Sequence, residues 1–184
     1  MKAAIEALRH DGGVILYPTE TLYGLGGRAQ DVQSAVRIGQ IKGRGLQPLI
    51  VLVNEVPEWL PDEARPIAEA FWPGALTLIV PAQGRFPKEI LGPDGGVAVR
   101  YSSHAVAQEL IEAVGPITST SANRTGEAPI FDVVNHALEV DAVVDCGAIA
   151  PSEASTIYHL QNGILRRGEL AVSLERFLEE GLES

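Results

Sequence analysis

Residues 16–27, which read LYPTETLYGLGG, concentrate groups that can bind a polar ligand. The stretch carries the hydroxyls of Thr19, Thr21 and Tyr23, the carboxylate of Glu20 and three glycines. A simple connection between two elements needs only about two to five residues and little chemistry. Hydroxyls both donate and accept hydrogen bonds, and glycines let a backbone bend close to a ligand. This stretch therefore predicts a binding loop.

Cations and hydroxyls also gather at the ends of elements further along the chain. Taken singly, each group has a structural explanation, because cations complement a helix C-terminus and Ser, Thr and Asn stabilise turns. In an open α/β sheet, however, residues at strand ends converge on a ligand crevice. Together they predict a site for a phosphate-rich ligand, formed by Lys42 and Arg44, Arg100, the cluster 118–123 (TSTSAN), the pair Ser155–Thr156 and the pair Arg166–Arg167.

Several common catalytic motifs are absent from the sequence. There is no G-x-x-x-x-G-K-[ST] phosphate loop, no G-x-G-x-x-G dinucleotide fingerprint and no G-x-S-x-G nucleophile elbow. The four histidines are isolated, and His104 attracts attention only because it opens a predicted helix after Arg100. The single cysteine, Cys146, excludes a disulfide framework and a cysteine zinc site. We therefore predict no metal site built from protein side chains.

Composition limits the partners of the chain. The formal net charge is −10, and the 14 basic residues are spread along the sequence. Extended nucleic-acid binding depends on many phosphate contacts from Lys and Arg, so a broad RNA groove is disfavoured, whereas a local cationic pocket for a small polyanion is compatible. No segment resembles a signal peptide or a membrane span. We expect a cytoplasmic protein with no membrane partner.

The hydrophobic pattern predicts an α/β fold with about seven strands, several of them buried on both faces. Asp31, Ser103 and Asp132 are predicted helix N-caps, and Val32, Ala35 and Val36 are expected to face the core. Helices are predicted at 3–10, 31–41, 61–72, 103–114, after 132 and from 173 to the end, and strands at 13–17, 48–53, 75–80, 97–101, 116–121, 142–146, 155–160 and 164–167.

These motifs resemble, in order, those of the YrdC-like family. The matching segments are PTETLYGLGG, KGR, FWPGALTLI, VAVR, STSAN, STI and ILRRG, which together extend from about residue 13 to 168. Each is weak alone, but seven in order are specific. The resemblance implies a single domain over 1–184 that closes with a helix at 173–184. It also implies a twisted open, largely mixed β-sheet flanked by helices, with a central cationic cavity.

The resemblance further implies an activity. Members of the family that consist of one such domain make threonylcarbamoyl-AMP from L-threonine, bicarbonate or carbon dioxide, and ATP, with release of pyrophosphate and with Mg²⁺ accompanying the ATP. A tRNA threonylcarbamoyl-transfer complex then uses the product to modify the adenosine beside the anticodon. A weak contact with tRNA is also compatible with this role. The carbamate nucleophile is already an anion, so catalysis needs positioning and charge stabilisation rather than a strong base.

Residue roles follow from the matched motifs. The K-x-R motif implies that Lys42 and Arg44 are catalytic and contact the ATP phosphates. The resemblance places Ser121, Asn123, Ser155 and Arg166 at the nucleotide. It places Thr19, Tyr23, Thr120 and Arg100 at the threonine, although Arg100 is equally suited to a phosphate.

Two alternatives remain open at this stage. One is an RNA-binding or ribosome-maturation factor of the same fold without synthase activity. Its support is the segment Lys42–Leu49, which is one residue and one lysine shorter than the usual K-G-R-P-x-x-K-P-L pattern. The other is a related carbamoyl-transferring domain that uses carbamoyl-adenylate, but such domains usually belong to much larger chains.

Overall fold

Helices and strands alternate along most of the chain, as the hydrophobic pattern predicts. The computed structural model describes residues 1–134, 136–166, 168 and 170–181. The helices are α1 (Lys2–Arg9), α2 (Val32–Ile41), α3 (Arg65–Phe71), α4 (Ala105–Val114), α5 (Ala171–Gly181) and the 3-10 helix η1 (Lys88–Ile90). The strands are β1 (Ile15–Pro18), β2 (Tyr23–Gly26), β3 (Ile50–Val53), β4 (Leu76–Pro81), β5 (Gly96–Tyr101), β6 (Ile117–Ser121), β7 (Ala142–Val143), β8 (Thr156–His159) and β9 (Gly163–Arg166).

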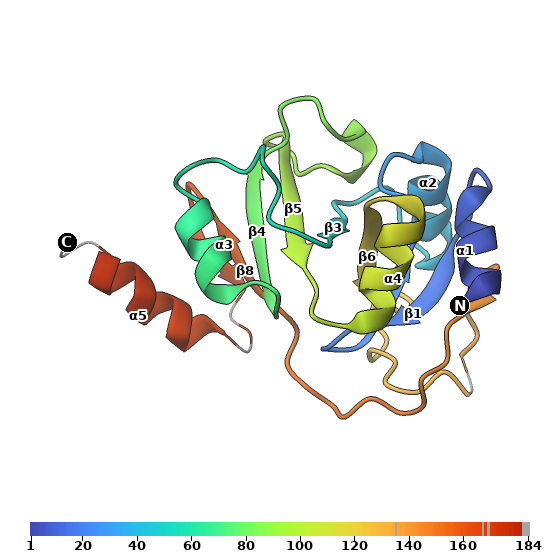
Figure 1. Cartoon of the computed structure of the whole chain (residues 1–184). Coiled ribbons are helices and arrows are strands. Elements are labelled where there is room, and N and C mark those ends of the chain that lie inside the picture. The colour runs from blue at the N-terminus through green and yellow to red at the C-terminus, as the bar shows by residue number, and fades with distance from the viewer. Residues whose placement is uncertain (135, 167, 169, 182–184) are drawn as a thin grey trace.

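Within the described residues, nine strands join one mixed sheet in the order β7-β1-β2-β6-β3-β5-β4-β8-β9. Helices flank the sheet (Figure 1). Three neighbouring pairs are parallel, namely β1 with β7, β3 with β5 and β4 with β8, and the others are antiparallel. The chain between β7 and β8 runs from the edge of the sheet formed by β7 to the opposite end, where β8 and β9 lie (Figure 1). The predicted class, a largely mixed sheet flanked by helices, is confirmed.

Two hydrophobic clusters cover opposite faces of the sheet. Because side chains alternate along a strand, Val51 and Val53 of β3 enter one cluster and Leu52 enters the other. The larger cluster packs the sheet against α2, α3 and α5, and the smaller one packs it against α1 and α4. The smaller cluster includes no residue of β4, β5 or β8, so that part of its face is left for other side chains.

Alternation along β5 places a charged residue on this uncovered part. Val97 and Val99 belong to the larger cluster, so Ala98 and Arg100 point to the opposite face. Arg100 lies beside Leu52 in the register of β3 and β5. The fold therefore turns Arg100 away from the main core and towards the face that α4 covers only in part.

Strand β2 is the main element that the sequence pattern misses. Residues 23–26 appear as a glycine-rich loop in sequence, yet they pair with β1 and β6 in the sheet. A Cβ at Gly26 would lie 1.9 Å from the carbonyl oxygen of Thr118, and one at Gly24 would lie 3.0 Å from the Ser119 hydroxyl. These glycines are needed because the backbones of β2 and β6 approach closely, which propensity alone does not reveal.

Three local predictions need correction. Among the described residues no helix starts at Asp132, whose carboxylate accepts a hydrogen bond from the backbone N–H of Val134 in a local turn. The N-cap of α4 is His104, whose Nδ1 accepts from the N–H of Val106, rather than Ser103. Val32 and Val36 are 39% and 40% exposed, so they do not belong to the core.

Other predicted elements differ only at their boundaries. Helix α3 begins at Arg65, because the residues from Pro61 form a turn first. The predicted strand end at Arg167 and the last three residues of the predicted final helix lie outside the described residues. Among the residues that are described, no helix is both long and apolar enough to cross a membrane.

Candidate active site

A cavity of about 370 Å³ lies where the loop between β1 and β2 meets the central strands. Its size is in the range of small-molecule sites, which are about 300–1,000 Å³. It is lined by Thr19, Thr21, Leu22, Arg44, Pro48, Ile50, Arg100, Ser119, Thr120, Ser121, Pro129, Ala154, Ser155, Ile157 and Arg166. Seven of the ten predicted site residues are in this set, namely Thr19, Arg44, Arg100, Thr120, Ser121, Ser155 and Arg166.

Lys42 and Asn123 stand behind the cavity wall and support Ser121. Helix α2 ends at Ile41, and the buried Lys42 ammonium donates to the carbonyl oxygens of Ser121 and Asn123 at 2.6 and 2.9 Å. The Ser121 hydroxyl in turn donates to Oδ1 of Asn123. The K-x-R and S-x-N motifs are thus joined in one network, while a direct contact between Lys42 and phosphate stays a prediction.

Gly43 separates the two cations of the K-x-R motif. Its φ of +66° lies in the left-handed region that favours glycine, so the chain turns sharply after the helix. Lys42 faces inward as a result, and Arg44 reaches the cavity. Although Lys42 and Arg44 belong to the same motif, Lys42 is therefore placed to support the cavity wall and Arg44 to contact a ligand.

The ammonium of Lys42 is predicted to titrate unusually low. Burial, with a smaller contribution from the positive charge of Arg44, lowers its pKa from 10.5 to about 8. The chain has only three lysines, so carbon-13 labelling of lysine gives few signals. An NMR titration should show Lys42 losing its proton near pH 8, below the value of about 10.4 that is typical of an unperturbed lysine.

The lowered pKa of Lys42 also determines whether the free energy of unfolding rises or falls with pH. Between pH 8 and 10.5, Lys42 is protonated in the unfolded chain but has lost its proton in the folded chain. The contribution of Lys42 to the free energy of unfolding therefore rises with pH in this range. The free energy of unfolding of the wild type should therefore increase relative to Lys42→Met between these pH values. A Lys42 signal that titrates near 10.5, as an unperturbed lysine does, would contradict the lowered pKa.

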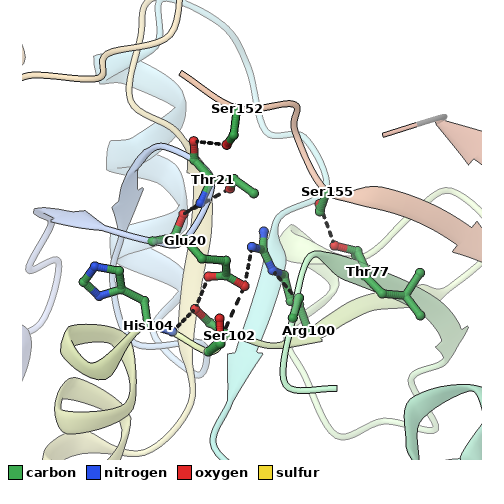
Figure 2. Close-up of polar contacts among 12 residues, drawn as sticks. Glu20, Thr21, Thr77, Arg100, Ser102, His104, Ser152 and Ser155 are labelled. Atoms are coloured by element: carbon green, nitrogen blue, oxygen red, sulfur yellow. Dashed lines mark hydrogen bonds and ion pairs between the residues drawn. The ribbon is translucent and has the colours of Figure 1, made fainter. Parts of the chain in front are cut away.

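Ser155 and Arg166 form another part of the cavity wall, and the buried Thr77 contacts Ser155. The guanidinium of Arg166 donates from Nε to the Ser155 carbonyl oxygen at 3.0 Å and from Nη2 to the Ser155 hydroxyl at 3.1 Å. That hydroxyl also lies 3.0 Å from Oγ1 of Thr77 (Figure 2). Burial, and to a smaller extent the positive charge of Arg100, lower the pKa of Arg166. The companion cation Arg167 lies outside the described residues.

The loop between β1 and β2 presents its hydroxyls unequally. Thr19 Oγ1 donates to the carbonyl oxygen of Leu22 at 2.7 Å, so its proton is committed to the turn. Thr21 Oγ1 lies 3.2 Å from Thr19 Oγ1, and it must be the donor in that pair. The free lone pairs of Thr21, which lines the cavity, can therefore accept a hydrogen bond from a ligand.

Tyr23 is placed away from the cavity lining. Its ring is fully buried in the larger hydrophobic cluster. Its hydroxyl donates to the carbonyl oxygen of Gly147 at 2.8 Å and accepts from the N–H of Cys146 at 3.0 Å. This geometry makes Tyr23 an anchor for the chain after β7, and its predicted contact with threonine stays untested.

Some lining residues were given no individual role from the sequence. Thr21 belongs to the predicted binding loop and Ser119 to the predicted cluster 118–123, so the sequence marked their segments but not their contacts. Pro48, Ile50 and Ile157 carry no reactive group. The register of the strands pairs Ile50 with Ser119 and Ile157 with Arg166, and Pro48 precedes β3.

Comparison with known proteins decides the family. The model of the Sua5/yciO/yrdC family, described as "Telomere recombination", matches residues 7–168. The chain belongs to this family. The resemblance inferred from the seven motifs is confirmed.

Individual members of the Sua5/YrdC family are similar over most of the chain. The threonylcarbamoyl-AMP synthase of Pyrococcus abyssi is 34% identical over 92% of this chain and 55% of its own length. The putative threonylcarbamoyl-AMP synthase of Mycobacterium leprae is 35% identical over 93% of this chain and 84% of its own length. The crystal structure of P. abyssi Sua5 complexed with L-threonine aligns with a TM-score of 0.79 and 33% identity, over 90% of this chain and 53% of that one. The chain thus spans about half the length of the P. abyssi relative.

Proposed function

We propose that this protein synthesises threonylcarbamoyl-AMP from L-threonine, bicarbonate or carbon dioxide, and ATP, and releases pyrophosphate. The observation that carries the proposal is one cavity that brings Arg44, Arg100 and Arg166 together with a row of hydroxyls. None of the described residues that line it is acidic, which suits an anionic ligand. The relatives named threonylcarbamoyl-AMP synthases support the same activity.

The phosphates of ATP fit the side of the cavity formed by Arg44, Ser121, Ser155 and Arg166. Guanidinium groups and hydroxyls stabilise the charge that develops on phosphoryl oxygens during transfer. Lys42 and Asn123 fix the Ser121 wall from behind. A wall held in place before the substrate arrives lowers the reorganisation needed in the transition state.

The threonine fits beside Thr21, Thr120 and Arg100. Arg100 suits an anionic group, and Thr21 offers an acceptor to the hydroxyl or the nitrogen of the amino acid. The neutral amine adds to carbon dioxide to form a carbamate and releases one proton to solvent. The carbamate oxygen then bonds to the α-phosphorus of ATP while the bond from this phosphorus to the bridging oxygen breaks, and pyrophosphate leaves. The attacking group is already an anion, so the residues need to hold the two substrates in line rather than to remove a proton.

Mg²⁺ is proposed to arrive with ATP rather than to occupy a site built by the protein. The cavity supplies hydroxyls and arginines, and the described residues contain no group of three or more His, Cys, Asp or Glu that could hold a metal. This donor set fits an ion that keeps its water and phosphate ligands. Its contribution would be to neutralise phosphate charge beside Arg44 and Arg166.

The product is an activated adenylate, so a transferase must consume it. We propose a cytoplasmic role in which a tRNA threonylcarbamoyl-transfer complex takes the threonylcarbamoyl group from this protein. The alternative of an RNA-binding factor without synthase activity is less favoured, because the similar relatives are named synthases and the net charge is −10.

Pyrophosphate release tests the proposed activity. The purified protein is incubated with ATP, Mg²⁺, L-threonine and bicarbonate, and each component is omitted in turn. We expect pyrophosphate that depends on both threonine and ATP. Well-folded protein that releases none above background would contradict the proposal, and salt-sensitive RNA binding in its place would favour the RNA-binding alternative.

A further inference from the structure

Glu20 joins three elements next to the cavity residue Arg100. It belongs to the loop between β1 and β2, and its Oε1 lies 2.6 Å from Nη2 of Arg100 at the end of β5. Its Oε2 accepts a hydrogen bond from the hydroxyl of Ser102, and its Oε1 accepts one from the N–H of Ser103 at 3.4 Å. These last two residues lead into α4, so the carboxylate is held on both oxygens (Figure 2).

Arg100 needs this partner because it is almost fully enclosed. Its side chain is only 5% exposed, and its Nε donates to the carbonyl oxygen of Gly74 at 3.1 Å. A buried guanidinium without a counter-charge is costly. The contact of Nη2 with Glu20 is an ion pair that lacks the alignment of a hydrogen bond. Attraction between opposite charges therefore makes a main contribution to holding this end of Arg100.

Glu20 also balances two arginines that share the cavity. Arg100 and Arg166 both line it, and the charge of Arg100 contributes to lowering the pKa of Arg166. Burial alone would raise the pKa of Glu20, but Arg100 and the hydrogen bond from Ser102 hold it below the usual range. The carboxylate is thus ionised at neutral pH and offsets the repulsion between the two guanidinium groups.

We propose that Glu20 is a positioning residue that fixes the guanidinium of Arg100 for its anionic substrate group. This inference rests on the proposed function, in which Arg100 acts on the threonine side of the cavity. Glu20 is absent from the cavity lining, so it acts through Arg100 rather than by contact with the substrates.

The kinetic test uses Glu20→Gln, which keeps the shape of the side chain and removes its charge. We expect kcat/KM for threonine to fall at least tenfold, while KM for ATP changes less than threefold because the wall around Arg44 is untouched. Glu112→Gln, the same change at an exposed position of α4, should behave as the wild type. An unchanged kcat/KM, or an equal loss for both substrates, would overturn the proposal.

A double variant separates positioning from a general structural defect. Arg100→Gln should lower kcat/KM for threonine by a factor similar to that of Glu20→Gln. The double variant should have a kcat/KM no lower than that of Arg100→Gln alone. Losses that multiply would show that Glu20 acts independently of Arg100, which contradicts the inference. If Glu20→Gln does not fold, Ser102→Ala removes one hydrogen bond to the carboxylate and should give a smaller loss of the same kind. A folded Ser102→Ala with full activity would then overturn the proposal.

A crystal structure of Glu20→Gln tests the inference without turnover. The Arg100 guanidinium should leave the carbonyl oxygen of Gly74, and an Arg100 in its original position would overturn the inference. Absence of threonine-dependent pyrophosphate release by the wild type would instead contradict the proposed function. The two failures are therefore distinguishable.

Discussion

Replacing Arg44 with alanine should lower the rate of threonine-dependent pyrophosphate release at least tenfold, which corresponds to about 1.4 kcal/mol in the barrier. Arg44 lines the cavity directly, whereas its motif partner Lys42 is committed to the carbonyl oxygens of Ser121 and Asn123. Loss of its charge removes stabilisation from the phosphates without emptying a packed core. Steady-state kinetics with ATP and threonine varied in turn give the measurement.

The matched control for this variant is Arg176→Ala. Arg176 lies exposed on α5, and α5 contributes no residue to the cavity. Its loss should change the rate less than twofold, as expected for a surface substitution away from the site. Full activity of Arg44→Ala, with thermal unfolding like that of the wild type, would show that the phosphates bind elsewhere.

Replacing Gly26 with alanine should destabilise the fold by about 3 kcal/mol or more, a large fraction of the roughly 5–15 kcal/mol of a typical domain. The added methyl group would lie 1.9 Å from the carbonyl oxygen of Thr118, so β2 and β6 would have to separate. Thr118 also donates from its N–H to the carbonyl oxygen of Gly27 at 2.7 Å, and this contact would be strained. Equilibrium unfolding in denaturant measures the loss.

Gly45→Ala is the matched control for Gly26→Ala. A Cβ at this position meets nothing within 4 Å, so the free energy of unfolding should change by less than about 0.5 kcal/mol. If Gly26→Ala were as stable as Gly45→Ala, the close approach of β2 to β6 would be wrong.

Local signals in the sequence predicted elements whose cause is itself local. Asp31 was predicted as an N-cap, and its carboxylate accepts from the N–H groups of Gln33 and Ser34. Strand β2 was missed because its glycines contradict strand propensity and are explained only by the neighbouring β6. The helix predicted from Asp132 shows the opposite error, because the Asp132 side chain has the chemistry of an N-cap but forms a local turn, and no helix starts there among the described residues.

The sequence predicted which residues form the candidate site better than it predicted how their side chains are arranged. Motif order identified most of the polar residues that line the cavity, including Arg100 and Ser155. It did not show which hydroxyls are free, because those of Thr19 and Tyr23 are taken up by contacts that only the fold creates. Glu20 was unassigned for the same reason, since its partners Arg100 and Ser102 are about eighty residues away in sequence.

Mass spectrometry of the reaction product tests the central claim most directly. The protein is incubated with ATP, Mg²⁺, L-threonine and carbon-13 bicarbonate, and the mixture is analysed at once because the adenylate is an activated species. We predict a product with the mass of threonylcarbamoyl-AMP that carries the label and is absent when threonine is omitted. Pyrophosphate release without a labelled adenylate, or no product from folded protein, would contradict the assignment of this cavity to threonylcarbamoyl-AMP synthesis.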